Sequence, residues 1–233
     1  MTLSPTDIVI GSFEESARNA TGTAVIIDTF RAFTTAAIAL ANGAESILMV
    51  ASLEQALELR AAEAGSVCIG ERGGLRPEGF DFGNSPAEIA GVSFAGQVVI
   101  QTTSNGTRGI LAASHANVVF AGALVTAAAT ARAILKSPVL PVSLVAMGDA
   151  GPERRDEDEV TALYLRALLT GRGPDRRAVA EAIRTMADLK DTRQLSGADV
   201  SACLAIDSCD FAIGVERETM AGKPVARARR VGV

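Results

Sequence analysis

The stretch Ala24-Val25-Ile26-Ile27-Asp28-Thr29-Phe30-Arg31 decides the fold class. Its four apolar residues stand together without polar alternation, which is typical of a strand buried on both faces of a parallel sheet. The apolar run ends at an aspartate, and Asn42-Gly43 is a stop signal for the alanine-rich helix expected over residues 34–40. A strand, a polar turn and a helix in this order predict a βα unit of an α/β protein.

The same alternation of β-branched runs and alanine-rich stretches continues along the chain. It predicts further strands over residues 47–50, 67–69, 98–100, 118–120 and 142–146, and further helices over 53–64, 106–114, 127–135, 156–169, 177–189 and 198–206. We therefore expect a three-layer α/β/α fold with a largely parallel or mixed sheet.

The domain organisation is expected to be simple, because no linker or low-complexity tract interrupts the chain. Residues 1–233 are expected to form a single domain, and two closely packed α/β halves are the alternative. The alternative arises because residues 25–50 and 98–122 both follow the order strand, Thr-rich turn, alanine-rich helix, strand. The basic segment 223–230 is interpreted as a solvated terminus.

Composition and charge argue against several kinds of partner. The formal net charge is −5, whereas a nucleic-acid binder needs a broad basic surface. No stretch of about twenty apolar residues predicts a membrane span, and the first residues lack the basic region of a secretory signal. Three cysteines without paired spacing fit a reducing compartment, so we expect a cytoplasmic protein. Alanine-rich, aromatic-poor chains of this size often self-associate, which makes a homo-oligomer one expected state.

Asp28 and Arg31 are the first candidates for chemistry. Asp28 follows a buried strand, and ligands of open α/β sheets bind at the carboxyl ends of strands. With Arg31 a few residues later, the pair would hold a metal ion and an anionic oxygen side by side. The alternative, which the residues leave open, is that Asp28 caps the helix and Arg31 lies on the surface.

The segment 70–86 is dense in Gly, Pro, Arg and acids, and we interpret it as a long functional loop. Glu71 and Asp81 are oxygen donors of the kind that Mg²⁺ accepts, and Arg72 is able to grip a phosphate or carboxylate. Asn84 and Ser85 close the loop as further candidates for substrate binding. The alternative is an ordinary turn-rich loop, since the same residue types dominate plain turns.

A third candidate segment lies between a predicted strand and helix and reads Gln101-Thr102-Thr103-Ser104-Asn105-Gly106-Thr107-Arg108. Its hydroxyls, its amide and the free N–H groups of a helix start favour an anion. It lacks the Gly-Lys-Ser/Thr ending of a Walker loop. A plain helix cap needs only one of these polar residues, so the segment favours phosphate binding.

The fourth candidate segment is acidic. Gly148-Asp149 is followed by Asp156-Glu157-Asp158-Glu159 at a predicted helix start. Acids are common there because they interact favourably with the helix dipole. The alternative is that Glu157 and Asp158 face the sheet edge and complete a metal site.

Several phosphatase chemistries are excluded by the residues present. His115 is the only histidine, which rules out paired catalytic histidines and a multi-histidine metal site. No cysteine heads a Cys-x5-Arg loop, and no Asp-x-Asp pair of the haloacid dehalogenase type begins at Asp28. Carboxylates, hydroxyls and arginines remain, and these suit magnesium-assisted phosphoryl chemistry.

Together these segments resemble the 2-phosphosulfolactate phosphatase family. The matching stretches are IIDTFRAFTTAAIALANGA, GERGGLRPEGFDFGNSP and QTTSNGTRGI, with looser matches at the acidic helix start and DVSACLAID. The sequence departs from the family pattern at Thr29-Phe30 and Phe33. The resemblance implies a magnesium-dependent phosphomonoesterase that converts 2-phospho-3-sulfolactate to sulfolactate and phosphate.

The resemblance and the residues together suggest a division of roles. Asp28, Arg31, Glu71 and Arg72 are the catalytic candidates. Mg²⁺ would lie on carboxylates drawn from Asp28, Glu71, Asp81, Glu157 and Asp158. Substrate would be bound by Asn84, Ser85, Thr102, Thr103, Asn105, Gly106, Thr107 and Arg108. Two alternatives stay open: a magnesium phosphatase for a different phosphorylated hydroxy acid, and a non-catalytic anion-binding homologue.

Overall fold

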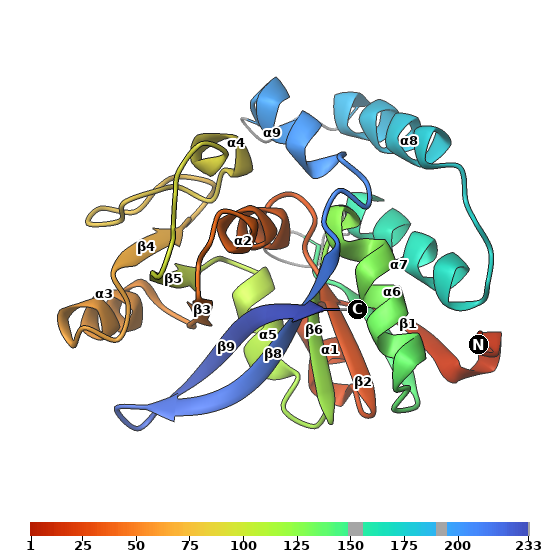
Figure 1. Cartoon of the computed structure of the whole chain (residues 1–233), viewed down its shortest axis with the longest axis horizontal. Helices are drawn as coiled ribbons and strands as arrows, with labels where there is room; N and C mark the ends of the chain where they lie inside the picture. The colour runs from red at the N-terminus through yellow and green to blue at the C-terminus, as the bar shows by residue number, and fades with distance from the viewer. Residues whose placement is uncertain (149–155, 190–194, 233) are drawn as a thin grey trace.

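The computed structural model describes residues 1–148, 156–189 and 195–232, and it has one nine-stranded sheet (Figure 1). The strands lie in the order β1-β7-β2-β6-β8-β9-β3-β5-β4. Their bounds are β1 Ile8–Ser12, β2 Thr23–Ile27, β3 Ser46–Met49, β4 Val67–Gly70, β5 Val98–Thr102, β6 Val118–Gly122, β7 Val142–Ala146, β8 Phe211–Met220 and β9 Lys223–Gly232.

The sheet contains two parallel groups joined by a hairpin. Strands β1, β7, β2 and β6 are parallel to one another, as are β3, β5 and β4. Between the groups, the pairings β6–β8, β8–β9 and β9–β3 are all antiparallel, so the two groups run in opposite directions. The prediction of a largely parallel or mixed sheet is confirmed.

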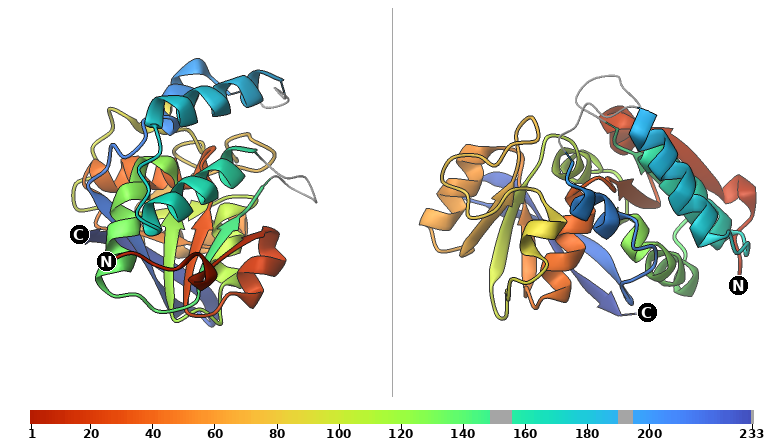
Figure 2. Two further views of the ribbon diagram at one scale, coloured as in Figure 1. Left: turned by 90° about the vertical axis from the view of Figure 1, so that its right-hand side faces the viewer. Right: turned by 90° about the horizontal axis from the view of Figure 1, so that it is seen from above.

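Helices cover both faces of the sheet, as expected for three layers. Their bounds are α1 Phe13–Asn19, α2 Ala32–Ala41, α3 Leu53–Ala61, α4 Pro86–Ile89, α5 Gly106–Ala112, α6 Ala127–Lys136, α7 Asp156–Leu169, α8 Arg176–Leu189 and α9 Gly197–Cys203. Figure 1 shows α2 and α5 near the middle of the molecule, with α3 at one side and α6 and α7 at the other. In both Figure 1 and the left view of Figure 2, α8 and α9 lie along the top.

Alternating side chains of the buried strands build the core on either face. On β2, Ala24 and Ile26 join the cluster that contains residues of α1, α2 and α5. Val25 and Ile27 point the other way, into the cluster formed with α6 and α7. Leu48 on β3 packs toward α3 in the same manner. Because both faces are buried, the strand residues are apolar without alternation, which explains the runs seen in the sequence.

Two crossovers bring the groups together. Helix α2 leads from β2 in one group to β3 in the other, and α5 leads from β5 back to β6. Both helices pack in the same core cluster, between the two sets of strands. The polar segments that begin these two helices are therefore brought to one place.

The interpretation of residues 223–230 as a solvated terminus is wrong. They belong to β9, whose Val225, Ala226 and Ala228 are buried. Two of the basic residues that suggested a tail pair with acids on β8: Arg227 binds Glu218 at 2.6 Å, and Arg229 binds Glu216 at 3.0 Å. Cross-strand ion pairs make the outer face of this hairpin polar, so its sequence lacks the apolar run of the other strands.

The remaining differences concern the ends of predicted elements and four elements that were not predicted. Helix α3 ends at Ala61 and α9 at Cys203, three residues earlier than expected in each case. The edge strand β1, the ten-residue strand β8, the helix α1 and the one-turn helix α4 were not predicted. In the described part of the chain, no helix combines the length and apolar character that a membrane crossing requires.

Candidate active site

Asp28 lies in the first turn after β2, where the chain enters α2. Its carboxylate is 8% exposed, and its Oδ1 accepts a hydrogen bond of 3.1 Å from the Ala32 amide. Its Oδ2 is directed toward the start of α5, because a Cβ added to Gly106 would lie only 2.8 Å from this oxygen. Gly106 therefore permits a close approach that a larger residue would prevent.

The electrostatic environment of the buried Asp28 carboxylate disfavours its ionised form. The pKa of Asp28 is raised to about 6, chiefly by burial, with a further contribution from the negative charges of Glu71 and Glu157 and against the lowering effect of the Ala32 and Gly106 amides. Negative charges close to a buried carboxylate disfavour its ionisation. A cation placed among them would relieve this repulsion.

Asp158, in the first turn of α7, stands beside the same group. Its Oδ1 accepts from the Thr29 amide at 2.8 Å, and its Oδ2 accepts from the Gly148 amide at 3.1 Å. Burial raises the pKa of Asp158 well above its ordinary value, and the charges of Asp28 and Glu157 add to this effect. The structure thus brings the acidic helix start to the end of β2. Asp149 and the side chain of Asp156 lie outside the described residues.

Glu71 connects the loops that follow β4 and β5. Its Oε1 accepts from the Ser104 amide at 2.6 Å, and its Oε2 accepts from the Ser104 hydroxyl at 3.1 Å and the Gly74 amide at 2.9 Å. The carboxylate is 8% exposed. Charged hydrogen bonds of this kind fix a carboxylate firmly in place.

The three predicted anion-binding arginines have different surroundings. Arg31 donates to Asp199 at 3.0 Å, and its side chain is 13% exposed. Arg72 donates to the Thr102 hydroxyl at 2.8 Å, and burial together with the nearby charge of Arg108 lowers its pKa, partly offset by Glu71 and Glu54. Arg108 is 57% exposed and pairs with Glu14 at 2.9 Å. Arg31 and Arg72 are thus held by their neighbours, whereas Arg108 lies at the surface.

The loop before α5 is ordered by its own hydroxyls. Thr103 Oγ1 accepts from the Thr107 amide at 3.1 Å, and Thr107 Oγ1 accepts from the Thr103 amide at 2.9 Å. Asn105 donates to the Gly148 carbonyl at 3.2 Å, which ties the loop to the segment after β7. The threonines are fully buried, so their observed contacts serve to shape the loop.

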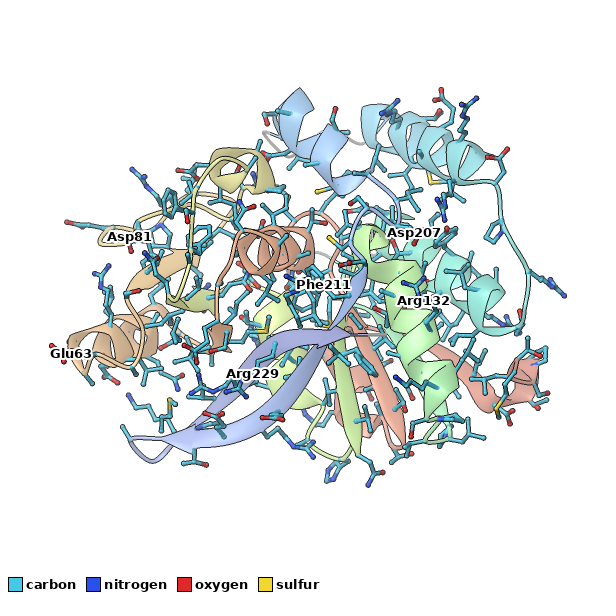
Figure 3. All side chains as sticks on the ribbon, viewed as in Figure 1. Glu63, Asp81, Arg132, Asp207, Phe211 and Arg229 are labelled. Atoms are coloured by element: carbon cyan, nitrogen blue, oxygen red, sulfur yellow. The ribbon has the colours of Figure 1, made fainter. Side chains whose placement is uncertain are left out.

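The predicted site residues at the end of the long loop, Asp81, Asn84 and Ser85, have different surroundings. Asp81 accepts from the Cys68 amide at 2.8 Å and pairs with Arg60 at 3.2 Å, and Figure 3 shows it to one side of the molecule. Ser85 donates to Asp199 at 2.6 Å. Asn84 is 6% exposed, and its Oδ1 has no hydrogen-bond partner among the described residues. The hydrogen bonds described for the Asp81 carboxylate thus lead to α3 and β4.

Asp199 is the residue that the sequence analysis missed. It lies in the first turn of α9, is 3% exposed and binds both Arg31 and the start of α4. Its sequence context, Ser196-Gly197-Ala198-Asp199, is an ordinary helix start, and Ser196 indeed caps the helix. Only the looser match of the DVSACLAID stretch pointed to this region.

The carboxylate oxygens of the site are suitable ligands for a hard cation, although they are not arranged as a complete coordination shell. Among residues 1–148, 156–189 and 195–232, no three His, Cys, Asp or Glu side chains form a ready metal-binding group. Asp28, Glu71 and Glu157 nevertheless interact electrostatically, and all three are carboxylates. Fold and site together define an α/β protein whose strand ends hold a buried set of carboxylates beside arginines.

This chain belongs to the 2-phosphosulpholactate phosphatase family, whose model matches residues 12–213. A protein of Thermus thermophilus named "Probable 2-phosphosulfolactate phosphatase" is 34% identical over 210 residues, which are 88% of each chain. Proteins with the same name from Carboxydothermus hydrogenoformans and Deinococcus radiodurans are 42% and 41% identical over 53% and 62% of this chain. The chain spans 52% and 62% of the length of these two relatives.

Proposed function

We propose that this protein is a magnesium-dependent phosphomonoesterase that hydrolyses 2-phospho-3-sulfolactate to 3-sulfolactate and phosphate. The observation that carries the proposal is Asp28, a buried carboxylate whose pKa is raised to about 6 at a strand end beside other acids. Strongly perturbed pKa values cluster at functional sites, so a carboxylate of this kind is a candidate for catalysis. The family match and the names of the relatives supply the substrate.

Asp28, Glu71 and Glu157 are the residues proposed to hold Mg²⁺. They are oxygen donors, and besides burial the charges of Glu71 and Glu157 raise the pKa of Asp28. Asp158 orients the site, because both of its oxygens accept backbone amides. Asp81 is left out, since it pairs with Arg60. When bound, Mg²⁺ would neutralise charge on the phosphate oxygens and the leaving group.

The arginines are proposed to receive the other charges of the substrate. Phospho-sulfolactate carries a phosphate, a carboxylate and a sulfonate, and a protein of net charge −5 needs local cations to attract it. Arg31 and Arg72 are partly buried. Arg31 donates to the Gly74 carbonyl, and the Gly74 amide binds Glu71. Arg72 follows Glu71 in the chain and donates to its backbone carbonyl. Guanidinium groups bind oxyanions through two parallel N–H donors. Arg108, at the surface, would guide the substrate toward them.

The test is phosphate release from a panel of phosphorylated hydroxy acids, with and without Mg²⁺. We expect release to depend on Mg²⁺ and to be fastest with 2-phosphosulfolactate. Asp28→Asn should lower kcat/KM by a factor of about 100 or more, whereas Asp207→Asn, at a buried aspartate bound to α8, should leave it unchanged. Faster release from another substrate would overturn the substrate, and binding without release would favour an anion-binding protein.

The pH dependence of Mg²⁺ binding gives a second readout. A carboxylate must be ionised to bind a metal, and the pKa of Asp28 is about 6. Mg²⁺ affinity, measured by calorimetry, should therefore be highest above pH 7 and fall as the pH drops through 6. Affinity that stays constant between pH 7.5 and 5 would exclude Asp28 as a ligand.

We also propose that the protein works in the cytoplasm. All three cysteines, Cys68, Cys203 and Cys209, are free thiols. Free thiols persist in a reducing compartment. Fractionation of the host cell tests this placement.

A further inference from the structure

Asp199 joins three segments that are distant in the sequence. Its Oδ2 accepts from Arg31 Nη1 at 3.0 Å, although 168 positions separate the two residues. Its Oδ1 accepts from the Ser85 hydroxyl at 2.6 Å and from the Ala87 amide at 3.1 Å. Both oxygens are therefore used, and the side chain is only 4% exposed. One carboxylate of α9 thus holds the loop after β2 against the start of α4.

The surroundings of Asp199 favour its ionised form. Burial opposes ionisation, but the bonds from Ser85 and Ala87 and the charge of Arg31 hold the pKa of Asp199 below its ordinary value. The hydroxyl and the amide would suffice to anchor α9 on α4. The ion pair with Arg31 is an additional contact, and it reaches toward the candidate active site.

Arg31 has a second partner in the loop that carries Glu71. Arg31 Nη2 points to the Gly74 carbonyl at 3.5 Å, and the Gly74 amide binds Glu71. The guanidinium thus lies between Asp199 on one side and the loop that carries Glu71 on the other. An arginine has five N–H donors, and the hydrogen bonds of Arg31 to described residues use one donor on Nη1 and one on Nη2. The remaining N–H groups are the donors that we assign to an oxyanion.

We propose that Asp199 is a positioning residue that orients the Arg31 guanidinium to bind an oxyanion of the substrate. The inference rests on the proposed function for the identity of that substrate, but not for the binding of an oxyanion. Without Asp199, Arg31 would be a flexible side chain whose donors are not directed at the site. Orienting it in advance reduces the entropy lost on binding.

Asp199→Asn is the variant that isolates this role. Asparagine keeps an acceptor oxygen for Ser85 and Ala87, so α9 should stay docked on α4. Its NH₂ group would face Arg31, and two donors do not pair. Hydrogen bonds between charged groups contribute roughly 1.5–3 kcal/mol, so the affinity for inorganic phosphate should fall roughly 10- to 100-fold.

Asp207, which lies at the start of α6 (Figure 3), offers a closely matched control. It is also buried, with a side chain 3% exposed, and it pairs with an arginine, Arg176, at 2.9 Å. It accepts from a hydroxyl, that of Tyr164, at 2.6 Å, and from the Ala128 amide at 2.7 Å. Asp207→Asn therefore removes an equivalent set of interactions without touching Arg31. It should cost comparable stability and leave phosphate affinity unchanged.

The experiment is a double-mutant cycle on the full chain, with phosphate affinity measured by calorimetry at fixed Mg²⁺ concentration. The proteins are wild type, Asp199→Asn, Arg31→Ala, the double variant and Asp207→Asn, each checked by thermal unfolding. If Asp199 acts through Arg31, Asp199→Asn should weaken binding in the wild type but by less than twofold in the Arg31→Ala background. Additive losses, or an equal loss in Asp207→Asn, would overturn the proposal.

Chemical rescue provides a readout that a purely structural role would not move. Millimolar guanidinium should restore the phosphate affinity of Arg31→Ala, because Asp199 is still present to bind the guanidinium ion. It should not restore the phosphate affinity of the double variant, which lacks the Asp199 carboxylate. Equal responses of the two would contradict the inference. Wild-type protein that releases no phosphate from any ester, yet shows this coupling, would disprove the proposed function and leave the role of Asp199 intact.

Discussion

Asp28 illustrates a conflict between stability and function within one residue. In the native state its pKa is about 6, against 3.8 for a free aspartate, so the folded protein binds more protons than the unfolded chain between these values. Stability therefore falls as the pH rises from about 4 to 6, and the full cost applies above about 6. A shift of this size corresponds to about 3 kcal/mol.

Asp28→Asn should therefore stabilise the metal-free protein while it lowers kcat/KM. At pH 7.5 we expect the free energy of unfolding to rise by up to about 3 kcal/mol, because the buried charge is removed. The gain should shrink toward zero as the pH approaches 4, where Asp28 is protonated in wild type as well. Denaturant unfolding at several pH values, with EDTA present, measures it, and a gain independent of pH would refute this account.

At the scale of elements, the start of α5 must approach the end of β2 very closely. A Cβ on Gly106 would lie 2.8 Å from Asp28 Oδ2, 2.9 Å from Ala32 Cβ and 3.1 Å from the ring of Phe33. Two of these neighbours belong to the well-packed α2, which has little room to move. The glycine in the Asn105-Gly106-Thr107 stretch is thus explained by contact between two crossover helices.

Gly106→Ala should accordingly destabilise the protein and displace Asp28. Alanine favours helix by up to about 1 kcal/mol, but overpacking costs about 1–3 kcal/mol and moves the carboxylate. Gly197→Ala is the control, because Gly197 is also the first residue of a helix and a Cβ there meets nothing within 4 Å. Thermal unfolding and Mg²⁺ affinity should decline for the first variant only. Similar results for both would show that the close approach is unimportant.

At the scale of the molecule, the hairpin of β8 and β9 holds two oppositely directed groups of strands in one sheet. Strand β6 pairs with β8 at residues 213–215, and β3 pairs with β9 at residues 226–228. The carboxyl ends of β2 and β5 meet at Asp28 and Gly106 although their groups run in opposite directions. The active site therefore depends on a hairpin that contributes none of its candidate residues.

A polar residue on the buried face of β9 should separate the groups. Ala228 is fully buried between β8 and β3, so Ala228→Asn adds volume and an unpaired amide, at a cost of about 2–4 kcal/mol. Arg229→Asn introduces the same side chain at the next, exposed position and should cost less than about 1 kcal/mol. Denaturant unfolding and phosphate affinity measure both. Equal losses would argue that the hairpin is not what joins the groups.

Much of the fold follows from local sequence. The strand bounds of β7 and the helix bounds of α7 agree with prediction, and the segments expected to carry the chemistry follow β2, β4 and β5. Apolar runs, helix stops and glycine-rich loops act over a few residues, so they can be recognised without tertiary context. The division of 1–233 into one domain or two halves stays a prediction.

The sequence by itself determined the α/β class, most strand and helix positions, and the candidate acids and arginines. Tertiary structure alone decided that residues 223–230 form a central strand, that Asp81 pairs with Arg60 apart from Asp28, and that Asp199 reaches Arg31. These features depend on contacts between residues far apart in the chain. Locally, the basic stretch 223–230 and the helix start at Asp199 have the same sequence pattern as segments of a solvated surface.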